Sequence, residues 1–362
     1  MKKILYILFT ASLLAVSCTK EVLVSRDHDL DAEVTDIKTK MEMAVLYCNI
    51  NDAEDESLLD LQSVGNYLDA CSAENANLKV VTFVAPANVN GTKFTSWLNS
   101  YAAEKNLQAL SVEDEGGELC MGALVSKELE VTKYEVSQYE LSHAILHFEA
   151  DDIHFVVTDL KEARNAVPTD WEAQIEAMTT NKKAAAIVYT PDVLSERKAE
   201  LEKIFSRTME YTDALQNRPF LKDKYWLWTI DMNAPSIVDA KYQKVFARMD
   251  CYDYDSDSEA FFTTVTDYFS VSEFLDSKDP YFATTQMMVY NGLVDCLSEH
   301  SMFTSSSVNN SDNPVYDRNN FVYMSYACWN MLDEDALTLD KEAVNELGTT
   351  HYPVLVKLKS EE

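Results

Sequence analysis

Basic residues are scarce in this chain. Lys and Arg number 30 among 362 residues, against 61 Asp and Glu, and the formal net charge is −31 at pH 7. Proteins bind nucleic acids nonspecifically through cationic contacts to phosphates, so a surface this acidic repels DNA and RNA backbones. The composition therefore disfavours nucleic acid as a partner, and it disfavours a nuclease that acts on polymers.

Closely spaced cysteine pairs are also missing. The seven cysteines are scattered along the chain, and no Cys-x-x-Cys pair occurs. Zinc clusters commonly use such pairs, so a structural zinc site is not expected. Several of the cysteines lie in apolar runs, where a free cysteine behaves as a small buried hydrophobe. Pairing of some of them stays open, and no disulfide connectivity is predicted.

The apolar run at the start of the chain is too short for a membrane span. Lys2 and Lys3 precede an apolar stretch over residues 4–14, whereas a span needs about 20 residues. The following residues 14–18, Leu-Ala-Val-Ser-Cys, resemble the processing site of a bacterial lipoprotein. That resemblance implies cleavage before Cys18 and lipidation of Cys18, including palmitate. An uncleaved anchor is the alternative.

Three segments follow from this interpretation: a signal peptide over 1–17, a tether over 18–40 and one domain over 41–362. Residues 19–40 are polar and charged without a strong period, which suits a tether. Several acyl chains on one residue hold a protein on a membrane better than one chain does. We therefore expect a lipid-anchored protein of the bacterial cell envelope, at the outer rather than the inner membrane.

Strands alternate with helices along the domain, and residues 143–159 form a predicted hairpin. This order favours α/β layers with mixed sheets. Strands are predicted at 43–50, 78–86, 121–127, 143–148, 153–159, 184–189, 225–230, 321–324 and 349–358, and helices at 52–73, 92–105, 169–178, 191–207, 235–249, 261–275 and 282–297.

Residues 225–236, YWLWTIDMNAPS, form the most informative stretch. The continuous apolar run predicts a strand buried on both faces. It ends at Asp231 and Asn233, which lie on the same side of an extended chain because they are two residues apart. Pro235 then forces a turn. The pair either belongs to a functional site or caps the backbone of its own turn.

This stretch resembles the Gly-Asp-x-Asn motif of the endonuclease/exonuclease/phosphatase superfamily, with Ile230 in place of the glycine. The final strand, residues 349–358 (TTHYPVLVKL), resembles the closing Ser-Asp-His-x-Pro strand of the same superfamily, and the two motifs occur in the superfamily's order. The resemblance extends over most of residues 43–358. It implies a four-layer α/β/β/α sandwich of two mixed sheets with outer helices, and a magnesium-dependent site for phosphoester hydrolysis.

Four positions keep the residue that the superfamily uses. By this resemblance His351 is the catalytic histidine, and Asp231 and Asn233 orient the attacking water and hold the phosphate. Asn49 matches the asparagine that ends the superfamily's first strand near the active site, and Asn49 and Asp231 are the candidate metal ligands.

Four other positions have changed. Ala85 stands where the superfamily has its magnesium-binding glutamate, and alanine cannot coordinate a cation that prefers carboxylate oxygens. Asp159 replaces a histidine that contacts the phosphate, and an anion repels phosphate. Asn320 and Thr350 each replace an acid. Catalysis of the superfamily's kind is therefore predicted to be absent or greatly weakened, with Asp231, Asn233 and His351 vestigial.

The leading hypothesis is a membrane-anchored lipoprotein that binds a small molecule or a protein without catalysis and without a cofactor. Its cleft could be lined by Trp226, Trp228 or Tyr352, although such aromatics also suit a plain core. The rival hypothesis is a magnesium-dependent phosphodiesterase or phosphatase for a small phosphoester, with carboxylates from Asp159, Asp231 or Glu118. A third possibility is a purely structural envelope protein without a pocket.

Overall fold

The computed structural model describes a sandwich domain, and the first residue that it describes is Glu42. The predictions on Cys18, Asn233 and Thr350 lie outside the described residues, as do those on 1–40, 169–178, 184–189 and 235–249. The described residues are 42–51, 59–160, 191–209, 225–232, 253–255, 260–262, 283–297, 305–307, 315–317, 320–340, 342–349 and 351–359.

Two mixed sheets, each of six strands, pack face to face. The first has the order β17-β18-β1-β2-β6-β5 and the second β13-β16-β10-β9-β8-β7. The first sheet contains β1 (Met43–Asn49), β2 (Leu78–Pro86), β5 (Leu107–Glu113), β6 (Leu119–Ser126), β17 (Leu332–Leu339) and β18 (Val354–Leu358). The second contains β7 (Val131–Tyr134), β8 (Ile145–Ala150), β9 (Ile153–Asp159), β10 (Tyr225–Asp231), β13 (Leu293–Asp295) and β16 (Asn320–Ser325).

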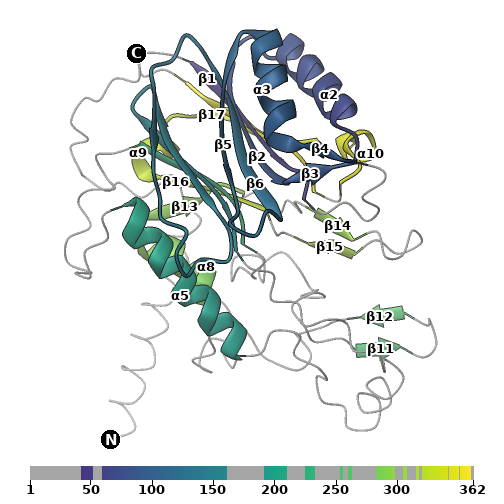
Figure 1. Ribbon diagram of the computed structural model, residues 1–362. Coiled ribbons are helices and arrows are strands. Elements are labelled where there is room, and N and C mark those ends of the chain that lie inside the picture. Colours follow the sequence, from purple (N-terminus) through teal and green to yellow (C-terminus); the bar gives the residue numbers. More distant parts are fainter. Residues whose placement is uncertain are drawn as a thin grey trace, which may run out of the picture.

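Helices cover the outer face of each sheet. Figure 1 shows α2 and α3 together on one side of the sandwich and α5 with α8 on the other. The predicted four-layer α/β/β/α sandwich is therefore confirmed. The helices are α2 (Leu61–Glu74), α3 (Phe94–Lys105), α5 (Pro191–Thr208), α8 (Ala283–Tyr290), α9 (Tyr326–Trp329) and α10 (Ala343–Leu347). Three short ladders complete the described elements: β3 (Asn88–Val89) with β4 (Thr92–Lys93), β11 (Asp253–Asp255) with β12 (Ala260–Phe262), and β14 (Ser305–Ser307) with β15 (Val315–Asp317).

Parallel pairing explains the apolar runs. β1 pairs in parallel with β2, and β9 with β10, so these strands are covered on both faces and carry few polar residues. In β10, Tyr225 and Leu227 face the core between the sheets, whereas Trp226 and Trp228 belong to the cluster beneath the outer helices. Successive side chains of every strand alternate between these two environments.

Helix α2 begins later than the sequence pattern predicts. Asp60 is its N-cap, and the side chain accepts hydrogen bonds from the backbone N–H groups of Gln62 and Ser63. A capping aspartate satisfies backbone donors that have no partner within the helix. The predicted helix over 52–73 is thus wrong at Leu59 and Asp60, and α2 starts at Leu61.

The predicted helix over 282–297 is helical only in its first part, and the rest forms a strand. Helix α8 ends at Tyr290, Gly292 has a φ of 84°, and the chain then enters β13, which pairs with β16. A positive φ suits glycine and ends a helix. The edge strands β5 and β17 were not predicted either.

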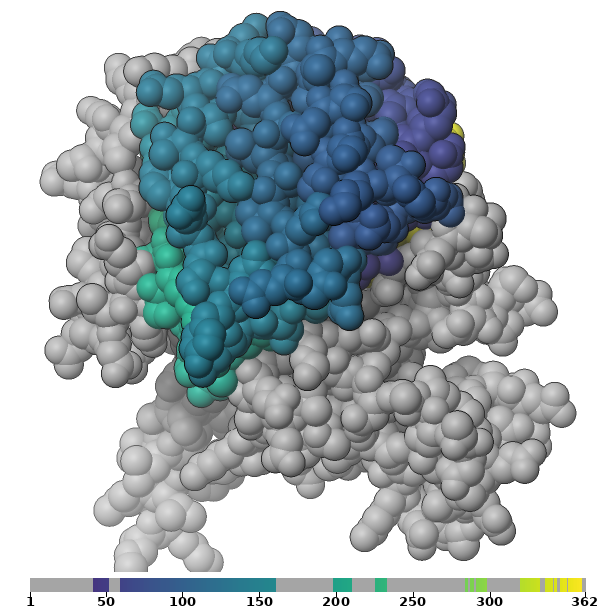
Figure 2. Space-filling model, viewed as in Figure 1, coloured from purple at the N-terminus to yellow at the C-terminus, as the bar shows by residue number. Residues whose placement is uncertain are grey.

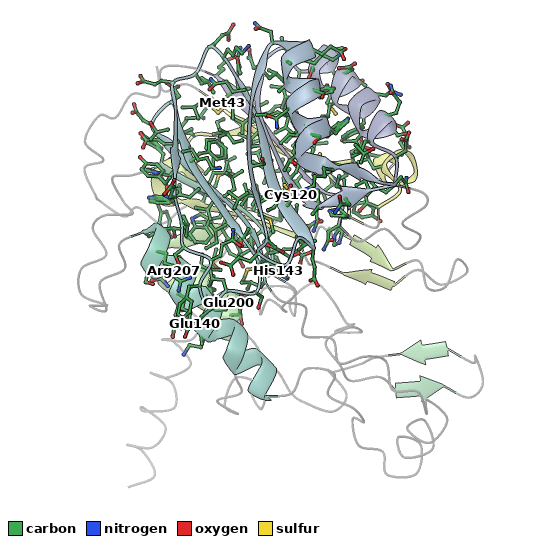
Figure 3. The ribbon with its side chains drawn as sticks, in the orientation of Figure 1. Met43, Cys120, Glu140, His143, Glu200 and Arg207 are labelled. Carbon is green, nitrogen blue, oxygen red and sulfur yellow. The ribbon has the colours of Figure 1, made fainter. Side chains whose placement is uncertain are left out.

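The start of β1 and the region around His143 lie at opposite ends of the sandwich. Figure 3 places Met43, at the start of β1, far from His143, which lies near Glu200 of α5.

The part of the chain over residues 59–160 forms most of the coloured surface in Figure 2. Among the helices described, none is both long and apolar enough to cross a membrane.

The core between the sheets sets the stability of the domain. Phe155 is fully buried there and stacks on Phe148, with the ring centroids 4.9 Å apart. We expect Phe155→Ala to lower the free energy of unfolding by about 3–5 kcal/mol, because it leaves a cavity. Urea unfolding measures this. Tyr139→Ala, at a side chain that is 70% exposed, is the control and should change stability by about 0.5 kcal/mol or less.

Candidate functional site

An amide group joins the two sheets at the end where β1 and β10 finish. The Nδ2 of Asn49 donates hydrogen bonds to Asp231 Oδ2 and to Asn320 Oδ1, each 2.8 Å long. Its own Oδ1 accepts a hydrogen bond of 3.0 Å from the backbone N–H of Asn51. Both N–H groups of the buried amide are thus used to bridge oxygens of the second sheet.

Strand register brings three polar side chains together on the second sheet. Asp231 is paired with Asp159 on β9 and with Asn320 on β16. Paired residues of neighbouring strands point to the same face, here toward the first sheet. Asp159 and Asp231 are both buried. The site therefore holds two carboxylates side by side in an interior environment, where like charges repel strongly.

His351 approaches the same carboxylate from the first sheet. Its Nε2 lies 3.9 Å from Asp231 Oδ2, and its side chain is 1% exposed. This distance is too long for a hydrogen bond and describes an electrostatic contact. The backbone N–H of His351 donates to Thr349 Oγ1, which in turn donates to the carbonyl of Asn49. The turn before β18 is thereby fastened to the end of β1.

Tyr47 belongs to the site although sequence reasoning missed it. Its hydroxyl lies 3.4 Å from Asn320 Oδ1 and donates to it. Burial, followed by the charges of Asp231 and Asp159, raises the pKa of Tyr47 well above its usual value. The phenol therefore stays protonated near neutral pH and serves as a donor. Its position two residues before Asn49 in β1 was the available signal, since both then face the second sheet.

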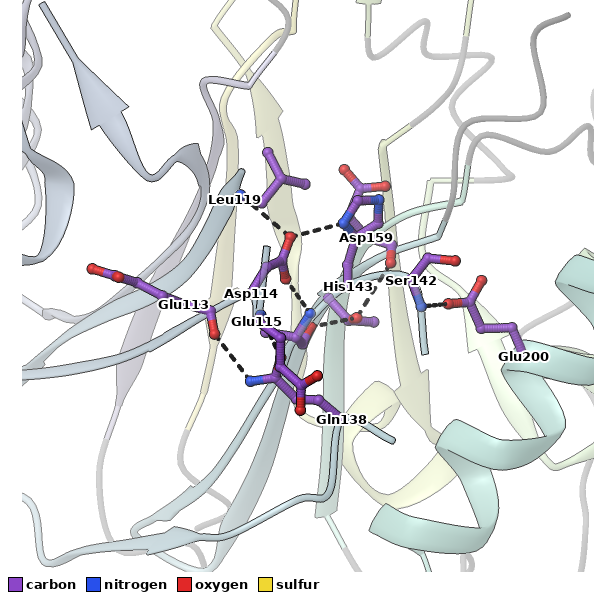
Figure 4. A network of polar contacts seen from close by, with 11 residues as sticks. Glu113, Asp114, Glu115, Leu119, Gln138, Ser142, His143, Asp159 and Glu200 are labelled. Atoms are coloured by element: carbon purple, nitrogen blue, oxygen red, sulfur yellow. Dashed lines mark hydrogen bonds and ion pairs between the residues drawn. The ribbon is translucent and has the colours of Figure 1, made fainter. Parts of the chain in front are cut away.

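A second acid–imidazole pair connects the sheets near this end (Figure 4). Asp114, in the turn between β5 and β6, has its Oδ2 2.9 Å from His143 Nδ1. Its carboxylate also accepts from the backbone N–H groups of Leu119 and Ala144. Thr158 Oγ1 donates to the carbonyl of Ala144 and ties the pair to β9. No sequence motif indicates this contact, because its partners are loop residues 29 positions apart.

Comparison with solved structures identifies the architecture. An AP endonuclease from Archaeoglobus fulgidus matches with a TM-score of 0.50 and 11% identity, over 87% of this chain and 99% of that chain. A 3'-5' exonuclease (NExo) from Neisseria meningitidis matches with a TM-score of 0.50 and 11% identity, over 88% and 100%. The chain has the endonuclease/exonuclease/phosphatase fold. No protein-family model and no curated protein matches this sequence.

The endonuclease/exonuclease/phosphatase fold brings Asn49, Asp231 and His351 together, as the sequence resemblance implied. Asp159 and Asn320, two of the positions that the resemblance marks as changed, lie in register with Asp231. Asn233 and Thr350 lie outside the described residues. Glu118, the third acid considered for a metal, is exposed in the turn before β6.

Two predictions on this site need correction. Ala85 faces the cluster beneath α2 and α3, whereas Val84 is the β2 residue in register with Asn49 and faces the second sheet. Ala85 therefore does not face Asp231, as a residue at the position of a metal ligand would. Trp226 and Trp228 face the outer helices, opposite to Asp231, and are core residues that do not line a cleft beside it.

The Asn49 amide should contribute measurably to stability. Asn49→Leu keeps a similar volume but removes both donors, which leaves oxygens of Asp231 and Asn320 without those hydrogen bonds. We expect the free energy of unfolding to fall by roughly 2–4 kcal/mol. Asn66→Leu, at an exposed asparagine of α2, is the matched control. A loss at Asn49 no larger than that at Asn66, measured by urea unfolding, would contradict the bridge.

Proposed function

We propose that this chain is a membrane-anchored binding protein without catalytic activity, built on an endonuclease/exonuclease/phosphatase fold whose metal site has been lost. The observation that carries the proposal is the orientation of the Asn49 amide. Its nitrogen, rather than its oxygen, faces Asp231 and Asn320. The two N–H groups of Asn49 thus point at the side-chain oxygens of Asp231 and Asn320. A cation bound at this place would have to contact the same oxygens.

The residues at this position do not fit magnesium. Mg²⁺ requires near-octahedral oxygen coordination and is usually held by one or two carboxylates. Asn49 presents hydrogens toward Asp231, and the neighbouring β2 position in register is Val84. Among the described residues, no group of three or more His, Cys, Asp or Glu is placed to hold a metal ion. Metal-assisted hydrolysis needs the cation to offset phosphate charge.

The charge of the site also disfavours a phosphoester ligand. Asp159 stands where the resembled superfamily has a phosphate-contacting histidine, and it lies in register with Asp231. Two buried carboxylates repel a phosphate. The net charge of −31 opposes nucleic acids in the same way. A small molecule without phosphate, or a protein, is therefore the proposed class of ligand.

The anchor is proposed to be the lipidated Cys18 in the bacterial cell envelope, at the outer rather than the inner membrane. The described domain is compatible with this arrangement. Residue 42 leads directly into β1, whose other end carries Asn49. A tether over 18–40 would thus join the domain at the end opposite the polar site, about 20 Å away for a strand of seven residues. The site would then face away from the lipid anchor.

A second candidate function is the magnesium-dependent phosphodiesterase or phosphatase. The pairing of Asp159 with Asp231 favours it, because two adjacent buried carboxylates are stabilised by a shared cation. This candidate requires the Asn49 side chain to turn away from Asp231.

Hydrolysis of bis-p-nitrophenyl phosphate separates the two candidates. We expect the purified protein with added Mg²⁺ or Mn²⁺ to release p-nitrophenol no faster than the buffer, because the described residues around Asp231 do not fit a cation that would neutralise the developing charge. Asp231→Ala and His351→Ala should give the same background rate. Metal-dependent hydrolysis that both substitutions abolish would overturn the binding-only proposal and establish the second candidate.

Lipid anchoring is tested separately in a bacterial host. The full-length chain should incorporate labelled palmitate and sediment with membranes, whereas Cys18→Ser should incorporate no label, because the acylated sulfur is gone. Cys48→Ser, at a cysteine buried in the domain, is the control for the label. Palmitate incorporation that persists in Cys18→Ser would contradict the proposed anchor.

A further inference from the structure

Four planar side chains form a row on the outer face of the second sheet. Tyr134, His147, His154 and Trp226 come from β7, β8, β9 and β10, which are adjacent strands. The Tyr134 and His147 rings stack with centroids 4.5 Å apart, and the His154 and Trp226 rings stack at 4.3 Å. His147 also stacks on Trp226 at 5.3 Å. Strand register fixes this row, since Tyr134 pairs with His147 and Trp226 with His154.

The two imidazoles in this row contact each other through nitrogen. His147 Nε2 lies 3.2 Å from His154 Nδ1. At this distance one nitrogen carries a hydrogen and the other presents a lone pair. If both rings were fully protonated, two N–H groups would face each other and the contact would become repulsive. The contact therefore tolerates one extra proton on the pair but not two.

Glu149 sets the direction of this hydrogen bond. Its Oε2 accepts from the Tyr134 hydroxyl at 2.5 Å and lies 3.6 Å from His154 Nε2. The carboxylate favours a hydrogen on His154 Nε2, which leaves His154 Nδ1 as the acceptor and His147 Nε2 as the donor. Among the described residues, Tyr134 and His154 are the titratable groups in contact with His147, and Glu149 contacts both of them. Trp226 closes the row without titrating.

Burial makes the second proton costly. His147 is 5% exposed. Burial first, and then the neighbouring His154, lowers the pKa of His147 from 6.5 to about 4. The unfolded chain accepts this proton near pH 6.5, so the folded state loses stability as the pH falls from 6.5 toward 4. Below about pH 4 both states carry the proton, and this group contributes no further change.

We propose that the His147–His154 pair is an acid-sensitive latch. At neutral pH it adds a side-chain hydrogen bond across the β8–β9 hairpin, whose backbones are already paired, and keeps the two imidazoles stacked beside Trp226 on the outer face of the sheet. When both imidazoles are protonated, the contact breaks and the row separates around Trp226. This device is independent of the proposed function, because the row lies on the face of the sheet opposite to Asp231.

Urea unfolding at several pH values tests the latch in the whole chain. Between pH 6.5 and 4 the shift of His147 predicts a change of at most about 300-fold in the unfolding equilibrium constant. This part of the pH dependence should vanish in His147→Gln. His28→Gln, at a histidine of the predicted tether, is the matched control and should keep it. Equal pH dependence in His147→Gln and His28→Gln would overturn the proposal.

NMR on the unsubstituted protein gives a second readout that does not depend on a variant folding. The ring resonances of His147 should titrate near pH 4, and the indole resonance of Trp226 should shift over the same interval, because the two rings stack. His154→Gln should move the His147 titration upward, since it removes the neighbouring imidazole. Titration of His147 near pH 6.5 without a change at Trp226 would contradict the latch.

Discussion

The hydrogen bonds of the Asn49 amide are the interaction on which this end of the molecule depends. One side chain satisfies Asp231 and Asn320 on the second sheet, and the backbone carbonyl of the same residue holds Thr349 and thereby the turn that carries His351. These groups are buried, and a buried polar network is stable only when its donors and acceptors match. The amide supplies donors where the neighbouring strands supply oxygens.

This arrangement is the basis of our proposal that the chain binds a ligand without catalysis. The strands bring acid, amide and imidazole to one end of the sandwich, because β1 and β10 end there and β18 begins there. A neutral amide now meets the oxygens at the centre, and Val84 contributes an apolar side chain from β2. The fold requires only that the hydrogen-bond donors and acceptors of these groups are paired. Metal-assisted hydrolysis would also require a cation among them.

Much of the fold and part of the site could be predicted from the sequence. The apolar run before Asp231 predicted a buried strand, and the motif order predicted that Asp231 and His351 would meet. The assignment of Ala85 failed, because a residue's face follows from its register with β1 rather than from a motif. Edge strand β5 went unpredicted since its residues are all half-buried, and a strand without a clear inside and outside lacks strict alternation.

Contacts between distant loops and strands could not be predicted at all. The pair Asp114–His143 joins two loops 29 positions apart, and no local pattern encodes it. The His147–His154 contact lies within the predicted hairpin, but its geometry depends on the exact register of the two strands. The central claim, that the Asn49 amide takes the place of a cation, can be tested by anomalous diffraction from crystals soaked in Mn²⁺. The account predicts no manganese peak beside Asp231 and an unchanged Asn49 side chain. A peak about 2.1 Å from the Asp231 carboxylate, with Asn49 turned away, would contradict it.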